Sequence, residues 1–126
     1  MITVAIVAIL AAVALPSYSN YVKRGKLTEA FNTMSSFSLA LGQFYQDNRT
    51  YVGGCTAAPP TSLNFTYVCT LSSTAYTLTA TGTGSMAGFT FTLNQAGKQA
   101  TTTAPSGWAT NANCWVSDSS GTCKTY

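Results

Sequence analysis

The sequence contains no histidine and only three acidic residues, Glu29, Asp47 and Asp118. General acid–base catalysis needs a positioned histidine or a tuned pair of carboxylates, and these carboxylates lie far apart along the chain. A site for a hard cation such as Ca²⁺ needs several oxygen ligands close together, and the sequence offers no such cluster. The many serines and threonines fit solvated strand faces and loops. We therefore expect no enzyme activity, no cofactor and no metal site.

Charge is also absent from the first fifteen residues, in which Thr3 is the one polar side chain. Such a segment is a cleaved signal peptide, a membrane anchor, or a surface buried against other copies of the chain. A signal peptide has positive charge before its apolar stretch and a small-residue cleavage site after it. Here the basic residues follow the stretch, and Pro16-Ser17-Tyr18 is a poor cleavage site. A plain anchor needs about 20 apolar residues, so self-association is favoured.

Beyond this segment, apolar residues recur at steps of three and four, which is typical of one stripe of an α-helix. The stripe consists of Leu27, Phe31, Met34, Phe37, Leu41 and Phe44. Paired glycines at Gly53 and Gly54 favour a helix end there, because glycine adopts left-handed backbone geometry without steric cost. We expect one helix from Met1 to about Thr50, roughly 75 Å long at about 1.5 Å per residue. The rest of the chain is too small to cover this rod, so its N-terminal part must project.

Pro16 is the expected break in this helix. Proline removes one backbone hydrogen bond, and its ring crowds the carbonyl group four residues earlier, near Ala12. We expect this disturbance to appear as a bend in the single chain.

The C-terminal half alternates apolar and threonine side chains with a period of two, which is typical of strands buried on one face. The expected strands are Phe65–Leu71, Tyr76–Gly82, Phe89–Asn94 and Lys98–Thr103. Short turns between them favour an antiparallel meander over βαβ crossovers. The apolar face of these strands needs cover, and the helical stripe can supply it. The predicted fold class is α+β, with a long N-terminal α-helix packed on a four-stranded antiparallel β-sheet.

The cysteines are compatible with zinc or with disulfides. Zinc sites usually use tight pairs such as C-x₂-C, and the spacings here are wider. Disulfides persist in the oxidising compartment of an exported protein. Order along the chain favours Cys55–Cys69 and Cys114–Cys123, although other connectivities are open to four cysteines.

The formal net charge is +3, and the one basic cluster is Lys23, Arg24 and Lys26. This cluster fits a helix that leaves a membrane or a filament core for water. A DNA-binding surface usually has more dispersed cations, preferably with stacking aromatic residues. The cations left to build one are Arg49, Lys98 and Lys124. Nucleic-acid binding is left open but is not indicated.

The N-terminal residues resemble a known family. An apolar run to Leu15, then Pro16-Ser17-Tyr18, a second tyrosine at Tyr21 and a basic group follow in that order. This order resembles the N-terminal helix of type IV pilins, just after its opening. Further segments are similar to the C-terminal half of pilins and minor pilins: Tyr76–Thr81, Phe91–Gln95, Gly97 and Cys114-Trp115. The opening methylated phenylalanine and the glutamate of the family have no counterpart here, so no residue is assigned their roles.

The resemblance implies a structural subunit of a type IV pilus-like extracellular filament, serving adhesion, twitching motility or DNA uptake. Residues 1–25 would form a projecting hydrophobic helix half, and residues 26–126 a globular head. Near Pro16, the preceding turns would unwind into extended chain inside the filament. The Cys114–Cys123 bridge would enclose a loop displayed on the filament surface. The filament-core residues would be Ile2, Val4, Ile6, Val7, Ile9, Leu10, Val13 and Leu15.

The implied partners are identical subunits in a helical filament, the inner membrane before assembly, and the pilus assembly machinery. The protein would then occur in a pilus on the bacterial surface, and in the inner membrane as an unassembled subunit. One rival is a minor pilin that primes assembly at the tip. A second is a type II secretion pseudopilin, whose major kind resembles a calcium-binding family, and the carboxylate-poor C-terminal half argues against it. A soluble single-copy binding module is the third.

Overall fold

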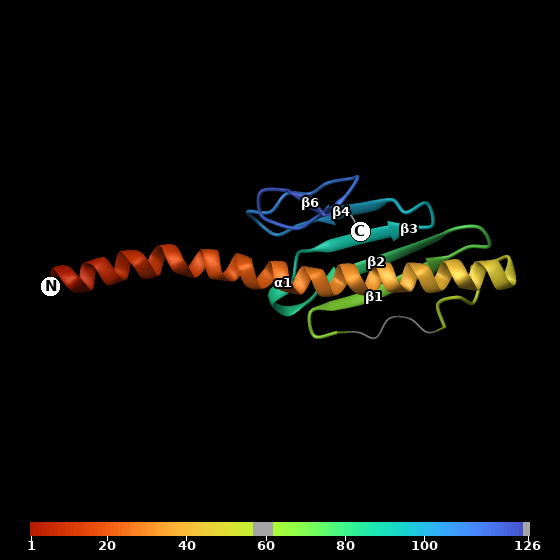
Figure 1. Cartoon of the computed structure of the whole chain (residues 1–126), viewed down its shortest axis with the longest axis horizontal. Helices are drawn as coiled ribbons and strands as arrows, with labels where there is room; N and C mark the ends of the chain where they lie inside the picture. Colours follow the sequence, from red (N-terminus) through yellow and green to blue (C-terminus); the bar gives the residue numbers. More distant parts are fainter. Residues whose placement is uncertain (57–61, 125–126) are drawn as a thin grey trace.

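The computed structural model describes residues 1–56 and 62–124. One α-helix, α1 (Ile2–Asn48), is followed by strands β1 (Phe65–Leu71), β2 (Tyr76–Gly82), β3 (Thr90–Asn94) and β4 (Gln99–Thr103). A short 3₁₀ helix, η1 (Gly84–Met86), precedes β3, and the described chain ends with β5 (Trp115–Val116) and β6 (Cys123–Lys124). Figure 1 shows the sheet along the C-terminal part of α1, while the N-terminal part extends alone away from it.

The long N-terminal helix is confirmed, and the bend expected at Pro16 in the single chain stays a prediction. α1 runs through Pro16 without interruption, and Figure 1 shows the rod only gently bowed in its first third. A proline removes one backbone hydrogen bond, and the bonds of the turns on either side carry the helix past it. Unwinding inside a filament stays a prediction.

The helix ends at Asn48, before the paired glycines. Arg49 adopts the left-handed conformation, with φ 59°, and its backbone N–H donates to the carbonyl oxygen of Tyr45 at 2.7 Å. This is the left-handed cap that commonly ends an α-helix, occupied here by arginine instead of glycine. Gly53 also has a positive φ, of 90°, but it lies in the turn that follows. Glycine was therefore a misleading end signal in this sequence.

The four-stranded antiparallel meander is confirmed, with strand order β1-β2-β3-β4. Ala80 of β2 lies opposite Tyr67 of β1 on one side and Phe91 of β3 on the other. Along β2, the residues facing α1 are buried, and the threonines between them are exposed or half-buried. The sheet therefore has one apolar face, which is covered by the helix, and one face rich in threonine.

Phe31 lies at the centre of the core between α1 and the sheet. Its ring stacks on Trp115, with centroids 5.0 Å apart and 9° between the ring planes. The edge-to-face contact with Phe91 also has a centroid distance of 5.0 Å. Around it, the buried residues of α1 are Leu27, Ala30, Met34 and Leu41. The predicted helical stripe is thus the inner face of the helix, with Phe37 half-buried against the core.

The C-terminal hairpin of β5 and β6 is held to the main sheet by buried polar contacts. The Thr101 hydroxyl donates to the Cys114 carbonyl oxygen at 3.0 Å and accepts from the Val116 N–H at 2.9 Å. The indole N–H of Trp115 donates to the Thr92 carbonyl oxygen at 2.9 Å. The buried hydroxyl of Thr101 and the indole N–H of Trp115 therefore both have partners, as burial requires, and the hairpin is fixed relative to β3 and β4.

Two disulfides complete the head. Cys55, in the turn after α1, is joined to Cys69 of β1, and Cys114 is joined to Cys123 of β6. The first bridge ties the exit from the helix to the edge strand of the sheet. The second closes the C-terminal hairpin.

Alanine at two glycines tests this packing. A Cβ on Gly82 would overlap the backbone of Met86, which is fully buried, so Gly82→Ala should cost about 1–3 kcal/mol through overpacking. No atom lies within 4 Å of a Cβ on Gly42, and Gly42→Ala should stabilise the helix by up to about 1 kcal/mol. Urea unfolding of both variants measures the difference. Equal free energies of unfolding would contradict the packing of η1 on β2.

Candidate functional site

The N-terminal third of α1, up to Leu15, is apolar around its whole circumference apart from Thr3. The first buried residue of α1 is Leu27. Soluble monomers rarely expose apolar patches larger than a few hundred Å², and α1 is long and apolar enough to cross a membrane. This surface is therefore suited to lipid or to other helices. The expected filament-core residues keep between 51% and 79% of their area exposed: Ile2, Val4, Ile6, Val7, Ile9, Leu10, Val13 and Leu15.

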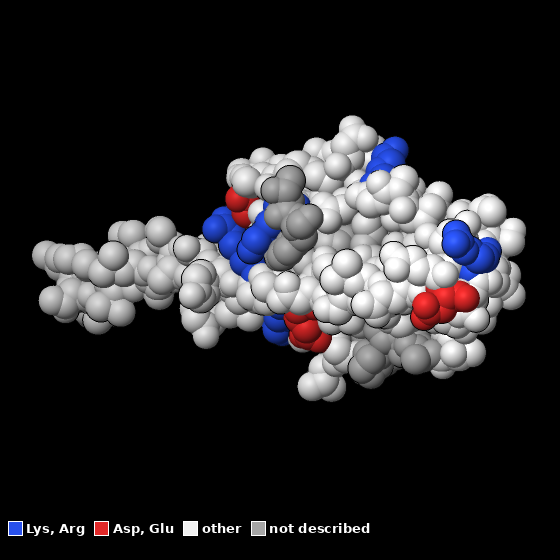
Figure 2. Space-filling model, turned by 45° about the vertical axis from the view of Figure 1, so that its right-hand side comes forward, with Lys and Arg blue, Asp and Glu red and all other residues white. Residues whose placement is uncertain are grey.

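The cations gather where this rod meets the head. We call this region the neck and define it by Lys23, Arg24, Lys26 and Lys124. Lys26 Nζ donates to the Ser85 hydroxyl at 2.7 Å, while Arg24 and Lys124 line one hollow of about 400 Å³. Figure 2 shows blue side chains around the junction of rod and head. Sequence reasoning missed Lys124, which only the fold of the C-terminal hairpin brings there.

Asp118 also lines this hollow. Its carboxylate accepts bonds from the Ser120 hydroxyl at 2.6 Å and from the N–H groups of Ser120 and Thr122, both at 3.0 Å. The hydroxyl of Ser120 is the main reason that the pKa of Asp118 is far below its ordinary value, and the bonds from Thr122 add to it. The group is therefore an anion that organises the turn between β5 and β6.

Two tyrosines of the sheet have raised pKa values. Burial raises the pKa of Tyr67, and the nearby Glu29 carboxylate raises it further. Burial likewise raises the pKa of Tyr76. Phenols perturbed in this direction stay protonated at neutral pH. They serve as core side chains and supply no base.

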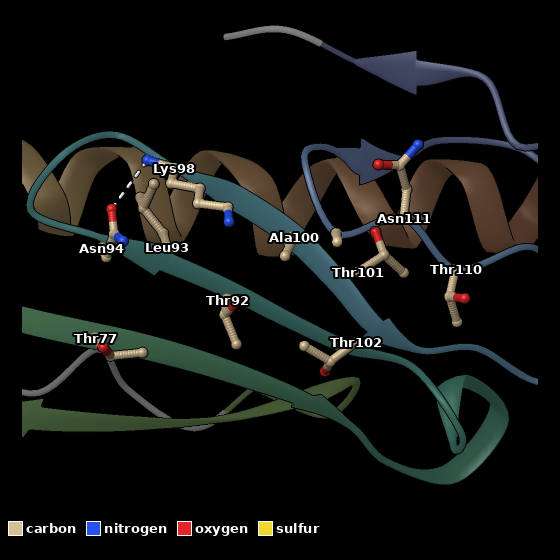
Figure 3. Close-up of a pocket in the computed structure, with 11 residues that line it drawn as sticks. Thr77, Thr92, Leu93, Asn94, Lys98, Ala100, Thr101, Thr102, Thr110 and Asn111 are labelled. Carbon is tan, nitrogen blue, oxygen red and sulfur yellow. Dashed lines mark hydrogen bonds between the residues drawn. The ribbon is translucent and has the colours of Figure 1, made fainter.

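The outer face of the sheet carries rows of threonine. Thr79 lies opposite Thr92, and Thr81 lies opposite both Thr66 and Thr90. A groove of about 460 Å³ crosses this face over β3 and β4 and is lined by residues including Lys98, Asn94 and Asn111. Figure 3 shows these side chains on the side of the sheet away from α1. The groove offers hydroxyl and amide groups and one cation, and no carboxylate lines it.

Over residues 1–56 and 62–124, no three side chains of the metal-ligating types come together. The arrangement consists of an apolar rod, a basic neck and a polar outer face.

Comparison with known proteins identifies the family. Residues 16–115 match the family described as type IV minor pilin ComP, DNA uptake sequence receptor. The chain belongs to this family. The resemblance to type IV pilins seen in the N-terminal residues is thereby confirmed.

Similar proteins include fimbrial and pilin subunits. The fimbrial protein EcpC of Eikenella corrodens is 47% identical over 47 residues, which cover 37% of this chain and 31% of that protein. The type IV major pilin protein PilE1 of Neisseria gonorrhoeae is 38% identical over 74 residues, covering 54% of this chain and 44% of that protein. The chain spans less than half the length of these relatives.

The fold is similar to that of a solved minor pilin. The non-core minor pilin PilV of Neisseria meningitidis superimposes with a TM-score of 0.61 at 18% identity. The match covers 68% of this chain and 91% of PilV. At this identity the likeness supports the pilin fold alone.

The ionisation of Asp118 gives a prediction about acid pH. A carboxylate with a lowered pKa stabilises the fold above its ordinary pKa of 3.8, and this contribution is lost as the pH falls towards the lowered value. We expect the Thr122 amide resonance to keep its neutral-pH position down to pH 3.8 and to move only below it. An NMR titration measures this, with Asp118→Asn as the variant that lacks the transition. A midpoint at or above the ordinary pKa would contradict the hydrogen-bonded turn.

Proposed function

We propose that this chain is a structural subunit of a type IV pilus-like filament and polymerises through the projecting part of α1. Residues 1–25 would pack in the filament core, and residues 26–126 would form the head around it. The observation that carries the proposal is the exposed apolar rod, continuous with a helix half that packs on the sheet in the head. Its partners would be pilin subunits, the inner membrane before assembly and the pilus assembly machinery.

The energy that drives assembly is helix packing. Burying a Val, Leu or Ile side chain from water contributes about 1.5–3 kcal/mol, but lipid already supplies most of that before assembly. The difference must come from close contacts between helices, which the small side chains among Ile2–Leu15 allow. Contacts whose rotation does not close into a ring generate a filament.

The family favours a minor pilin, which the sequence left as an alternative to a major one. The matching family is described as a minor pilin, whereas PilE1 is a major pilin. The relative abundance of this chain in sheared filaments separates the two. We propose no catalytic role, because the relatives are fimbrial and pilin proteins.

Lysine in the rod tests the proposal. Ile6→Lys and Ile9→Lys should abolish filaments, because a charge inside an apolar bundle has no partner, and even at mid-membrane it costs about 2.5–3.5 kcal/mol. Val68→Lys is the matched control, since Val68 is 60% exposed on the outer face of the sheet. Electron microscopy of sheared surface material measures the outcome, and immunoblots of membranes show whether the subunit is present.

Deletion of the rod tests whether the head folds without it. Deleting Met1–Tyr21 should give a soluble monomer with both disulfides intact, because the core begins only at Leu27. Circular dichroism and thiol titration measure this. Normal filaments from the lysine variants would exclude a role for the rod in assembly and leave a membrane-tethered binding domain.

DNA uptake is the biological role that the family description favours for the filament. With the rod in the filament core, α1 lies on the inside of each head and the outer face of the sheet points to the surroundings (Figure 1). The groove at Lys98 lies on this outer face. We propose it as the DNA contact, in which Lys98 meets a phosphate and the amides of Asn94 and Asn111 lie alongside. One subunit then makes few phosphate contacts, and repeated subunits supply the rest through avidity.

Salt dependence tests this groove. Lys98→Gln should weaken binding of duplex DNA by the full chain and reduce the slope of log affinity against log salt by about 1. Arg49→Gln removes the same charge at the far end of α1 and should leave the slope unchanged. Fluorescence anisotropy in mild detergent over a range of salt concentrations measures both. Equal slopes for the two variants would exclude the groove as the phosphate contact.

A further inference from the structure

The neck hollow lies directly beside the end of the apolar rod. Tyr21, Arg24 and Thr28 follow at steps of three and four and so share one side of α1. A shallow second hollow links Arg24 to Ser17, Asn20 and Tyr21, and Arg24 also lines the larger hollow with Lys124. A polar path with Arg24 at its centre therefore connects the rod to the C-terminal hairpin.

The side chains of this region follow the order found at a bilayer boundary, with apolar residues first, then tyrosines, then cations. Tyr18 and Tyr21 are 69% and 75% exposed, and tyrosine is enriched where a membrane meets water. The neck cations follow within about two turns. A rod inserted up to these tyrosines would place Arg24 and Lys124 at the level of the lipid phosphates.

We propose that the neck hollow binds the phosphate group of an anionic phospholipid while the subunit waits in the membrane. The inference rests on the proposed function, which places the subunit there before assembly. Arg24 approaches the phosphate from α1 and Lys124 from β6, so the site is built from both ends of the fold. The Cys114–Cys123 bridge holds the hairpin that carries Lys124.

The charges of the hollow favour one phosphate. Arg24 and Lys124 supply two positive charges, and Asp118 supplies one negative charge. The carboxylate of Asp118 is already engaged by Ser120 and Thr122, and it limits the hollow to weak, reversible anion binding. Such binding suits a subunit that must later leave the membrane.

Lipid fits the neck better than DNA does. In a filament the rod is enclosed by its neighbours, and the neck beside it is less open to a duplex than the outer face of the sheet. In the membrane, phosphates surround the neck by necessity. The cluster also opposes the usual excess of cations on the cytoplasmic side if the head lies outside, so insertion topology does not account for it.

The test measures lipid preference around the full chain in vesicles. The chain is reconstituted in mixed phosphatidylcholine and phosphatidylglycerol, and the association of spin-labelled phosphatidylglycerol is compared with that of spin-labelled phosphatidylcholine. We expect about a fivefold preference for the anionic lipid, the effect of roughly one effective cation near a membrane surface. High salt should reduce it, because the screening length falls to about 3 Å at 1 M.

Two double variants with equal charge loss decide the site. Arg24→Gln with Lys124→Gln should lower the preference well below that of the native chain, to the residual level that Lys23 and Lys26 supply. Arg49→Gln with Lys98→Gln removes the same charge away from the neck and should leave it intact. Circular dichroism checks that both fold. An unchanged preference in the neck variant, or an equal fall in both variants, would overturn the proposal.

Two further measurements identify what failed. If the neck variant keeps its lipid preference but loses duplex DNA binding in detergent, the neck hollow binds DNA phosphates and not lipid phosphates. Filament formation by the native chain is scored separately. Missing filaments would refute the proposed function, whereas normal filaments without a lipid preference would refute this inference alone.

Discussion

The contacts of Phe31 hold together the three parts of the molecule. The ring stacks on Trp115 of the C-terminal hairpin and meets Phe91 of the sheet edge-on. Aromatic pairs of this kind contribute about 0.5–1.5 kcal/mol each beyond the area that they bury. The helix, the sheet and the hairpin are therefore fixed to one another at one point. Because α1 is continuous from there to Ile2, this point also sets the direction in which the rod leaves the head.

The packing of Phe31 on Trp115 also brings the cations of the neck together. Arg24 lies two turns before Phe31 on the same side of α1, and Lys124 lies on the hairpin that Trp115 begins. The packing of one buried aromatic pair thus brings together two cations about a hundred residues apart in sequence. Loss of the β5–β6 hairpin would leave Arg24 in place on α1 but would remove Lys124 from the neck hollow. The hydroxyl of Thr101 and the Cys114–Cys123 bridge therefore support the neck as well as the core.

The parts predicted from sequence are those with a repeating pattern. The helical stripe and the strands of the meander follow from periods of three to four and of two, and burial forces each apolar face towards the other. α1 ends two residues before the expected end near Thr50, because Arg49 adopts a conformation that glycine favours. At Pro16 the helix continued because the loss of one hydrogen bond does not outweigh the intact turns around it. The strands of the β5–β6 hairpin are too short to show a period. The position of the hairpin depends on Thr101, which is buried and which the sequence pattern does not distinguish from the exposed threonines of the sheet.

The small number of charged residues shapes the rod, the neck and the outer face of the sheet alike. A rod without charge between Ile2 and Val22 can exchange lipid for neighbouring helices, because neither surrounding has to solvate an ion. The six cations of the chain are consequently confined to the head and the neck. Under the lipid and DNA proposals, any single head holds a polyanion weakly, whether that is a lipid surface or a duplex. A filament multiplies the same weak contact along its length, whereas a subunit in the membrane makes it once. Under these proposals, weak binding at the neck permits release during assembly, and weak binding on the outer face becomes effective only after assembly.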